Sequence, residues 1–323
     1  MFLTKLRTIG TAAETTPGTP IAVSGLLNNV RAWDLAIGSI TVEPDANPSK
    51  YATGDFGLGE SIPGNQSASI SFNTKFWSEA SGVEPAWTKF AKAAGCAVTE
   101  VDGDFDVYPS KDTVEDAITI GIFDIAGQNA ASGLHYEFTG AIGNCTVSTE
   151  GTGKPYTMGW EFTGALNDIK DIDVTEVPVY SGSVLIPDRF LAGSGVIGTH
   201  TVCISTMSFG FGNAVTPVQC QNSDSGYKQF VITNMEPTLT INPLLESNAD
   251  YDFWSKWTEG TIEAVTIETE QFKFYAPRCQ ITTANVEDSD GVLRTTLELR
   301  PLRPSTAGDY SYASWVMTIK SRE

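Results

Sequence analysis

The residues of this sequence that could do chemistry are few and widely separated. It contains two histidines, His135 and His200, and five cysteines, at positions 96, 145, 203, 220 and 279. A zinc site or a Ser-His-Asp triad needs several such groups at ligand or hydrogen-bond spacing. No pair of cysteines has zinc-ligand spacing, and an odd number of separated thiols is not a disulfide framework. We therefore expect structural histidines and buried thiols, no cofactor and no enzyme.

Two short motifs suggest ligands at first sight. The run Gly151-Thr152-Gly153-Lys154-Pro155 resembles part of a phosphate-binding loop, but the first glycine of that motif is missing and proline replaces the Ser or Thr that would hold magnesium. The acidic run Glu287-Asp288-Ser289-Asp290-Gly291 could hold a hard cation, but it is too short for an EF-hand and lacks the terminal bidentate Glu. Both runs are typical of hairpin turns, and Asp-Gly is a strong turn signal.

The composition is that of an acidic, folded protein. The 323 residues include 20 basic and 39 acidic residues, for a formal net charge of −19, with 41% apolar and 18% charged residues. The acidity argues against a protein that binds duplex DNA or anionic membranes, because both need clustered cations. Thirty Gly and sixteen Pro, with much Thr, Ser and Val, favour β-structure. No run of apolar residues is long enough for a membrane span, and the first residues lack the apolar region of a signal peptide. We therefore expect no membrane insertion and synthesis in the cytoplasm.

The sequence contains an internal repeat. Residues 39–44 align with 208–213, and residues 61–73 align with 230–242 without a gap, ending on Asn73 and Asn242. Both copies then reach Phe-Trp, at residues 76–77 and 253–254, and the run Ala-Ile-Thr-Ile at 117–120 matches Ala-Val-Thr-Ile at 264–267. These rings could stack on sugars, but their recurrence in both copies favours a role in the core. Order and spacing together favour a duplication.

The elements around the repeat define the expected architecture. Strand-like alternation of apolar and polar residues covers most of both copies, and an Ala-rich segment with early Pro and terminal Gly predicts a helix near residues 84–95. We predict a mainly β protein of two tandem antiparallel β-sandwich domains, the first with the added helix. Their expected limits are 1–170 and 201–323, joined by an extended, Gly- and Pro-rich linker over 171–200.

The arrangement resembles the tail tube (major tail) proteins of long flexible-tailed, siphovirus-type bacteriophages. The opening residues 12–20, the glycine-punctuated segments 140–144 and 159–164, and the segments 208–213 and 232–238 carry the resemblance. It implies β-sandwiches whose sheets join those of neighbouring subunits into rings, which stack into the tube that carries DNA into the host. It also implies other tail proteins as partners, such as the tape measure, terminator and distal tail proteins, and a place in the virion after assembly in the host cytoplasm.

The resemblance and the repeat together suggest particular surfaces. Two domains per chain predict homotrimeric, pseudo-hexameric rings, with hexamers as the alternative. A channel that passes DNA without holding it would explain the acidity, because like charge repels phosphate. The alternative explanation is that the acidity only maintains solubility. Glu268 and Glu270, taken to share one strand face, are the acids expected to face the lumen. The segment expected to become ordered on stacking consists of Glu14, Thr15, Thr16, Pro17, Gly18 and Thr19. Deletion of residues 1–20 is therefore expected to leave a folded chain that no longer forms long tubes.

A second function stays open at this stage. A carbohydrate-binding or adhesion module of a virion or cell surface would also show β-sandwiches with tryptophans. Glycan binding by the isolated chain would favour that alternative, whereas rings or tubes in negative-stain micrographs would favour the tail tube.

Overall fold

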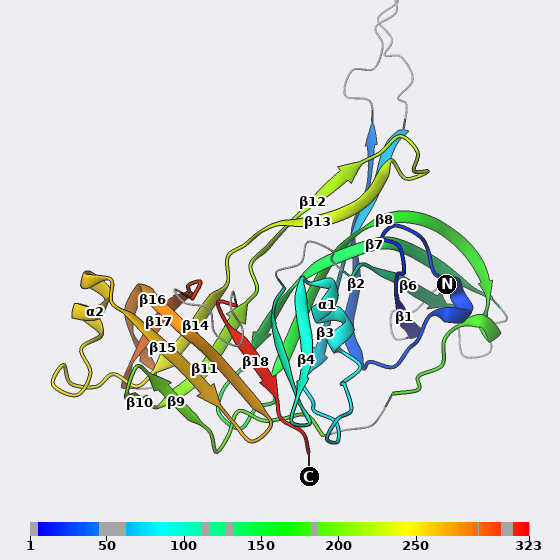
Figure 1. The fold of residues 1–323 in the computed structure, drawn as a ribbon. Helices are drawn as coiled ribbons and strands as arrows, with labels where there is room; N and C mark the ends of the chain where they lie inside the picture. The colour runs from blue at the N-terminus through cyan, green and yellow to red at the C-terminus, as the bar shows by residue number, and fades with distance from the viewer. Residues whose placement is uncertain are drawn as a thin grey trace, which may run out of the picture.

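A computed structural model of the chain describes residues 6–44, 63–110, 116–126, 132–182, 186–289, 291–304 and 313–322. Most of these residues lie in antiparallel strands, and two short helices pack beside them (Figure 1). The predicted mainly β fold is therefore confirmed. Among the described residues, no helix has the length and apolar character needed to cross a bilayer.

The first half of the chain supplies eight strands and helix α1. Their bounds are β1 Arg7–Ala13, β2 Ala32–Pro44, β3 Pro63–Lys75, α1 Thr88–Ala93, β4 Cys96–Val101, β5 Asp104–Pro109, β6 Ile118–Ile125, β7 Ser132–Ser148 and β8 Thr157–Asp173. Short 3-10 turns lie at Val23–Gly25 and Val174–Glu176.

The second half supplies the other strands and helix α2. Their bounds are β9 Ser194–Ile197, β10 His200–Val202, β11 Ile204–Gly210, β12 Asn213–Gln219, β13 Tyr227–Met235, β14 Thr238–Pro243, α2 Phe253–Glu259, β15 Ile262–Glu268, β16 Phe272–Ser289, β17 Val292–Pro301 and β18 Val316–Ile319.

The strand order contains the same series twice. In the first half the neighbours run β1-β6-β7-β8-β3-β2, and in the second half they run β9-β15-β16-β17-β14-β11. Strands β3 and β14 hold the same place in the two series, and each is followed along the chain by a helix, α1 after β3 and α2 after β14. The repeat found in the sequence thus appears as a repeated topology. Strands β6 and β15, which carry the matching Ile/Val-Thr-Ile runs, hold the same place in the two series; superposition of Thr119 on Thr266 stays a prediction.

One part of the sequence alignment of the two copies is wrong by a few residues. Ile70 in β3 and Leu239 in β14 correspond, and their partners across the sheet are Ile37 and Phe209. Phe209 therefore corresponds to Ile37, whereas the sequence alignment placed it on Ile40. The cause is that β2 contains register shifts, one of them between Ile37 and Ile40, which β11 lacks at that point. A β-bulge inserts residues without changing the face that a strand buries, so a gapless alignment cannot detect it.

The predicted helix is present, whereas strands enter the predicted linker at both of its ends. Helix α1 lies inside the predicted range, with Phe90 and Ala91 buried, Thr88 hydrogen-bonded to Glu84, and Gly95 at positive φ behind it. Within 171–200, however, β8 continues to Asp173 and β9 begins at Ser194. The sheet also crosses the predicted domain limits, because β11 pairs with β7 and the C-terminal β18 pairs with β5 as well as β16. The domain limits themselves stay a prediction.

A single aromatic core lies against one face of the sheet and spans both halves. In the first half, Phe90 of α1 contacts Trp160 and Phe72, and Trp160 donates its indole N–H to Thr74 Oγ1 at 2.9 Å. Phe76 meets Phe272 of β16 at 5.2 Å between ring centroids, which joins the halves. Phe76, Trp77 and Phe253 are buried, and Trp254 is half-buried against the same core, so these rings contribute to the core in both copies.

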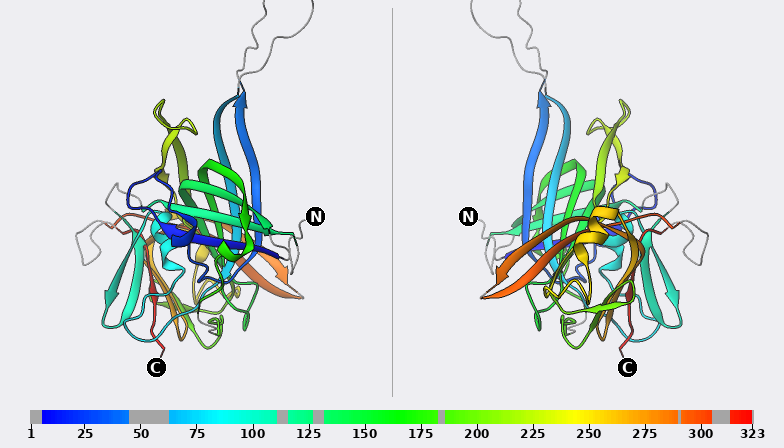
Figure 2. Two further views of the ribbon diagram at one scale, coloured as in Figure 1. Left: turned by 90° about the vertical axis from the view of Figure 1, so that its right-hand side faces the viewer. Right: turned by 90° about the vertical axis from the view of Figure 1, so that its left-hand side faces the viewer.

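Two long hairpins project from the body. Strands β2 and β3 run up and beyond the rest of the molecule, and the tip of β16–β17 projects on another side (Figure 2). The separate two-stranded sheet β12–β13 lies over β7 and β8 (Figure 1), where Tyr227 and Phe230 cover Ile142 and Ala165.

We predict that replacement of the buried Trp160 lowers the free energy of unfolding more than replacement of the partly exposed Trp257. Trp160→Ala removes a fully buried indole and its hydrogen bond, so it should lower the free energy of unfolding by about 3–5 kcal/mol in urea titrations of the unassembled chain. Trp257→Ala, at an indole that is 38% exposed, is the control and should cost clearly less. Equal losses for the two variants would contradict this description of the core.

Candidate functional site: the polar face of the central sheet

The strands on the other side of the core present a broad polar face. Eight strands, in the order β2-β3-β8-β7-β11-β14-β17-β16, form this part of the sheet. In β3 the residues Ala68, Ile70, Phe72 and Thr74 are buried against the core, so the residues between them point the other way. The polar face carries, from β3 to β17, Ser67, Ser69, Ser71, Asn73, Glu161, Thr163, Asn144, Thr146, Ser148, Ser208, Thr238, Thr240, Thr296 and Glu298.

The backbone register aligns these side chains in rows across the strands. One row can be followed through seven strands, from Lys75 to Thr157, Ser148, Ser208, Thr240, Glu298 and Thr283. It crosses from the first copy of the repeat to the second between Ser148 and Ser208 without a break. The row is therefore made mainly of hydroxyl groups, with a cation at one end and an acid near the other.

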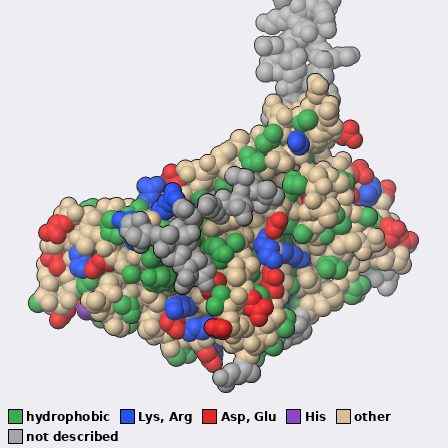
Figure 3. All heavy atoms as spheres, viewed as in Figure 1, with side chains coloured by type: hydrophobic (Ala, Val, Ile, Leu, Met, Phe, Trp, Pro, Cys, Tyr) green, Lys and Arg blue, Asp and Glu red, His purple; other side chains and the backbone are tan. Residues whose placement is uncertain are grey.

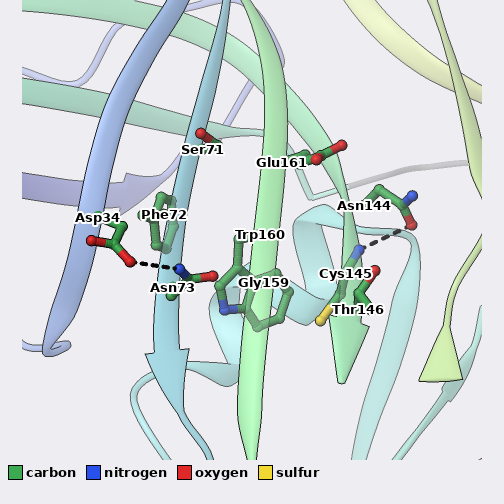
Figure 4. Close-up of a pocket in the computed structure, with 10 residues that line it drawn as sticks. All are labelled: Asp34, Ser71, Phe72, Asn73, Asn144, Cys145, Thr146, Gly159, Trp160 and Glu161. Carbon is green, nitrogen blue, oxygen red and sulfur yellow. Dashed lines mark hydrogen bonds between the residues drawn. The ribbon is translucent and has the colours of Figure 1, made fainter. Parts of the chain in front are cut away.

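The face is hollowed where β2, β3, β8 and β7 meet. The hollow has a volume of about 270 Å³, and the polar side chains around it include Asp34, Asn73, Asn144 and Glu161 (Figure 4). Asn73 Nδ2 donates to Asp34 Oδ2 at 3.3 Å, and Asn144 Oδ1 accepts from the backbone N–H of Cys145 at 3.0 Å. Asn73 and Asp34 therefore satisfy each other, and Asn144 satisfies a backbone N–H.

Nothing in the hollow is arranged as a reacting centre. Burial raises the pKa of the Cys145 thiol beside it, so the thiol stays protonated and is a poor nucleophile. Burial likewise raises the pKa of Cys279 to about 12. Over the described part of the chain, no group of three or more His, Cys, Asp or Glu side chains is placed to hold a metal ion. The face can offer hydrogen bonds and a weak negative potential.

The charged groups on and beside this face are sparse. Glu161 and Glu298 occupy the same place in the two copies, opposite Ser71 and Thr240 respectively. Lys75 lies at the end of its row, where its ammonium donates to Thr157 Oγ1 at 2.9 Å and sits over the Trp33 ring. Arg300 is 3.6 Å from the Glu236 carboxylate. A polyanion passing this face would find few cations with which to pair.

The predicted stacking segment, Glu14 to Thr19, is anchored within its own chain. The Glu14 carboxylate accepts hydrogen bonds from Gly18 N at 2.6 Å, Thr119 Oγ1 at 2.8 Å and Gly140 N at 2.8 Å. A Cβ at Gly18, which has φ of +82°, would lie 2.1 Å from the carbonyl oxygen of Lys228, so only glycine fits. Thr15, Thr16 and Thr19 are exposed. Contact of these residues with another copy stays a prediction.

This anchoring corrects the expectation that residues 1–20 can be deleted without harm to the fold. Strand β1, Arg7–Ala13, pairs with β6 along its whole length, and Arg7 forms a salt bridge with Asp124 at 2.6 Å. Polar and Gly-rich composition suggested a free arm because composition does not show long-range pairing. Deletion would remove a sheet strand.

The two acids predicted to face a lumen do not share a strand face. Strand β15 ends at Glu268, whose carboxylate is paired with Lys320, a contact that lowers the pKa of Glu268. Glu270 is exposed in the turn between β15 and β16. The strand pattern was extended two residues too far, because Thr269 instead turns inward and bonds Asp188.

The remaining motifs are structural in this fold. The run around Gly153 forms the tip between β7 and β8, where Gly153 N bonds Phe190 O at 2.8 Å. In the acidic turn, Asp288 Oδ1 accepts from Gly291 N at 2.7 Å, while Asp290 lies outside the described residues. His135 is buried and stacked on Phe123 at 4.5 Å, and burial lowers its pKa.

The polar face itself was not predicted, although the sequence carries a signal for it. The run Ser67-Ala68-Ser69-Ile70-Ser71-Phe72-Asn73 alternates small polar with apolar residues. Such alternation predicts one polar face per strand, but it does not say which polar faces of distant strands adjoin. That placement depends on the pairing of β7 with β11.

The chain is β-rich, and a broad face of its central sheet carries hydroxyl and amide groups. The phage tail tube protein family matches residues 4–300, and the chain belongs to this family. It is thus a structural component of the phage tail. No curated protein matches the chain.

Replacement of Glu14 tests whether the stacking segment is held by its own chain. Glu14→Gln retains one acceptor oxygen but turns an amide N–H₂ toward a donor, so we expect a loss of about 1–3 kcal/mol in the free energy of unfolding. The outcome is measured by urea unfolding, with Asp171→Asn, at an exposed β8 position, as control. Unchanged stability would show that the three contacts do not hold the segment.

The same variant should show a pH dependence of known sign. Burial raises the pKa of Glu14 above 4.5, its ordinary value, although its hydrogen bonds oppose the rise. A carboxyl with a raised folded-state pKa stabilises the protein most at low pH and loses that contribution as pH rises through the folded pKa. Glu14→Gln lacks this loss, so its destabilisation relative to the natural chain should be larger at pH 4 than at pH 7. A larger effect at pH 7 would contradict the direction.

Proposed function

We propose that the chain polymerises into stacked rings that form the tail tube, the channel through which DNA passes into the host. The observation that carries this proposal is the polar face of the central sheet, together with the family. A wall for moving DNA should be continuous and should lack clusters of cations that replace counterions. Rows of Ser and Thr with Glu161 and Glu298 have this character.

The polar face therefore takes the place of Glu268 and Glu270 as the proposed lumen surface. Its opposite face is filled by the aromatic core and helix α1. The β12–β13 hairpin covers the end of the polar face at Ile142 and Ala165, so the part of the face beyond that hairpin is the proposed channel wall. In the space-filling view, charged side chains are scattered among polar and apolar ones over the opposite side of the molecule (Figure 3). That side is suited to face solvent or the outside of a tube.

Ring size and partners are part of the same proposal. Each chain carries two copies of the sheet motif, so three chains would supply six copies in a ring, and hexamers of the whole chain are the alternative. The Glu14–Thr19 segment, with its exposed threonines, is proposed to contact the next ring. Tape measure, terminator and distal tail proteins are the proposed partners in the siphovirus-type virion, after assembly in the host cytoplasm.

Electron microscopy of the purified chain tests the proposal. We expect tubes or stacked rings in negative stain, and three chains per ring in a reconstruction. A monomeric chain that binds glycans and forms neither rings nor tubes would support an adhesion module instead. Six whole chains per ring would contradict the trimeric ring but not the tail tube.

Charge reversal on the polar face tests its proposed place at the lumen. In phage particles, Glu161→Lys with Glu298→Lys should slow DNA release, measured by a dye that reports ejected DNA, because each added cation pairs with phosphate. The delay should shrink at high salt, since screening weakens the attraction. Glu259→Lys, at an exposed site on α2, is the control and should leave release unchanged. Equal release rates for the natural chain, the double variant and the Glu259→Lys control would place the polar face away from DNA.

A further inference from the structure

The two copies of the repeat meet through one strand pair inside the chain. At this junction β7 pairs with β11, with Thr146 opposite Gly210, Val147 opposite Phe209 and Ser148 opposite Ser208. Val147 and Phe209 are both 0% exposed. The junction thus seals the core side of the sheet while the polar side continues across it.

Backbone register gives the residues that correspond in the two copies. The pairs Phe72–Trp160 and Ser71–Glu161 of the first copy correspond to Ile241–Leu297 and Thr240–Glu298 of the second. The isolated bridge between Leu244 and Arg294 extends the same series, because it takes the place of Lys75–Thr157.

This register locates the counterparts of the two junction strands. Val147 lies opposite Met158 in the first copy, and Val286 lies opposite Thr295 in the second, so Val286 is the counterpart of Val147. Phe209 corresponds to Ile37, as the pairing with Leu239 and Ile70 shows. The strand that corresponds to β7 is therefore β16, and the strand that corresponds to β11 is β2.

The counterparts lack the partner that the junction strands have. Among the described strands, β2 pairs with β3 alone, and from Thr283 onward β16 pairs with β17 alone. Val286 is 44% exposed and Ile37 is half-buried, whereas their counterparts in the junction are completely buried. The free side of β2 accepts one side-chain contact, from Arg7 Nη1 to Leu35 O at 3.4 Å.

The middle of the free edge of β2 lacks two of the ordinary protections against pairing, charges and prolines, although a register shift lies between Ile37 and Ile40. Natural edge strands carry charges, prolines or a covering element that prevent addition of another strand. From Leu35 to Val42, β2 has no charged residue and no proline, and both Ile40 and Val42 are exposed. An uncharged edge with exposed β-branched residues fits a strand that is paired in the assembled state.

We propose that β2 of one copy of the chain pairs with the C-terminal half of β16 of a second copy, in the register of the β7–β11 junction. Ile37 then lies opposite Val286 of the second copy, Ala36 opposite Glu287 and Gly38 opposite Asn285. The polar rows continue from copy to copy, and Val286 is buried on the core side. This pairing rests on the proposed function in one respect, namely that it is the contact within a ring.

Because the two edges lie on different strands, the contact is heterologous. Such a contact repeats from copy to copy until it closes as a ring or continues as a helix. A monomer or a closed dimer is not its product. The tip of the β16–β17 hairpin projects from the body, which leaves this edge accessible to a second copy (Figure 2).

Cysteine pairs test the register directly. Ala36→Cys with Glu287→Cys, in a chain whose less buried cysteines are replaced by Cys203→Ser and Cys220→Ser, should give disulfide-linked chains after mild oxidation of assembled protein. Each chain carries both cysteines, so the ladder on a non-reducing gel should end at the number of chains in a ring. Ala36→Cys with Thr283→Cys is the matched control, because Thr283 lies about 13 Å from position 287 along the strand.

A valine pair on one hairpin tests the interface without cysteines. Val286→Lys and Val292→Lys change residues that are 44% and 46% exposed in the unassembled chain, so both variants should fold. Only Val286 lies on the proposed interface. We expect Val286→Lys to raise the protein concentration needed for assembly by about tenfold or more, since it removes the burial of a valine, and Val292→Lys to leave it unchanged.

The outcomes separate this pairing from the proposed function. Tubes or rings without the Ala36–Glu287 cross-link, or with equal effects of the two lysines, would overturn the pairing and leave the tail tube standing. A chain that forms neither assemblies nor cross-links would overturn both. A cross-link ladder with a silent Thr283 control, together with an effect of Val286→Lys alone, supports the pairing.

Discussion

The constraint on which this structure depends is that a sheet must pair the backbone groups at both edges of every strand or expose them to water. The chain carries two copies of one sheet motif, and each copy has a free edge on β2 or its counterpart β11. The β7–β11 junction closes that edge for one copy inside the chain. It also places the polar rows of both copies on one face. The geometry of the candidate site therefore follows from a strand pair rather than from any particular side chain.

Apolar and small polar residues alternate along β3, so the same strand builds both the core and the polar face. Phe72 packs against Phe90 and Phe162, and Ile70 is buried in the same core, while Ser69 and Ser71 face the other way. Alternate residues of the strand serve its two faces, so β3 can bury large rings in the core and present small polar groups on the opposite surface. Stability and the character of the proposed channel wall thus come from the same residues. A substitution on one face changes the other only through backbone register.

The sequence could predict the elements whose signals are local, and it failed where the outcome depends on distant pairing. The helix at Thr88–Ala93, the turn at Gly151–Pro155 and the mainly β class follow from Pro, Gly and period-two patterns. The removable N-terminal arm did not hold, because Arg7–Ala13 finds its partner in β6, far along the chain. The predicted shared strand face of Glu268 and Glu270 was wrong for a related reason: Thr269 bonds Asp188, and β15 ends at Glu268. The repeat was found, but bulges in β2 hid its register.

Duplication within one chain also changes how an assembly of this motif can be tuned. In a ring of separate single motifs every junction is the same surface, and each one costs the entropy of immobilising a subunit. In the proposed ring every second junction would lie within one chain, where it is fixed by the shared core around Phe76 and Phe272 and by the pairing of β18 with both β5 and β16. The junction within the chain holds the fully buried Phe209, while its proposed counterpart between chains carries the smaller, half-buried Ile37. In the proposed assembly, divergence of the two junctions would allow one repeated motif to give both a folded chain and a sheet that continues from chain to chain.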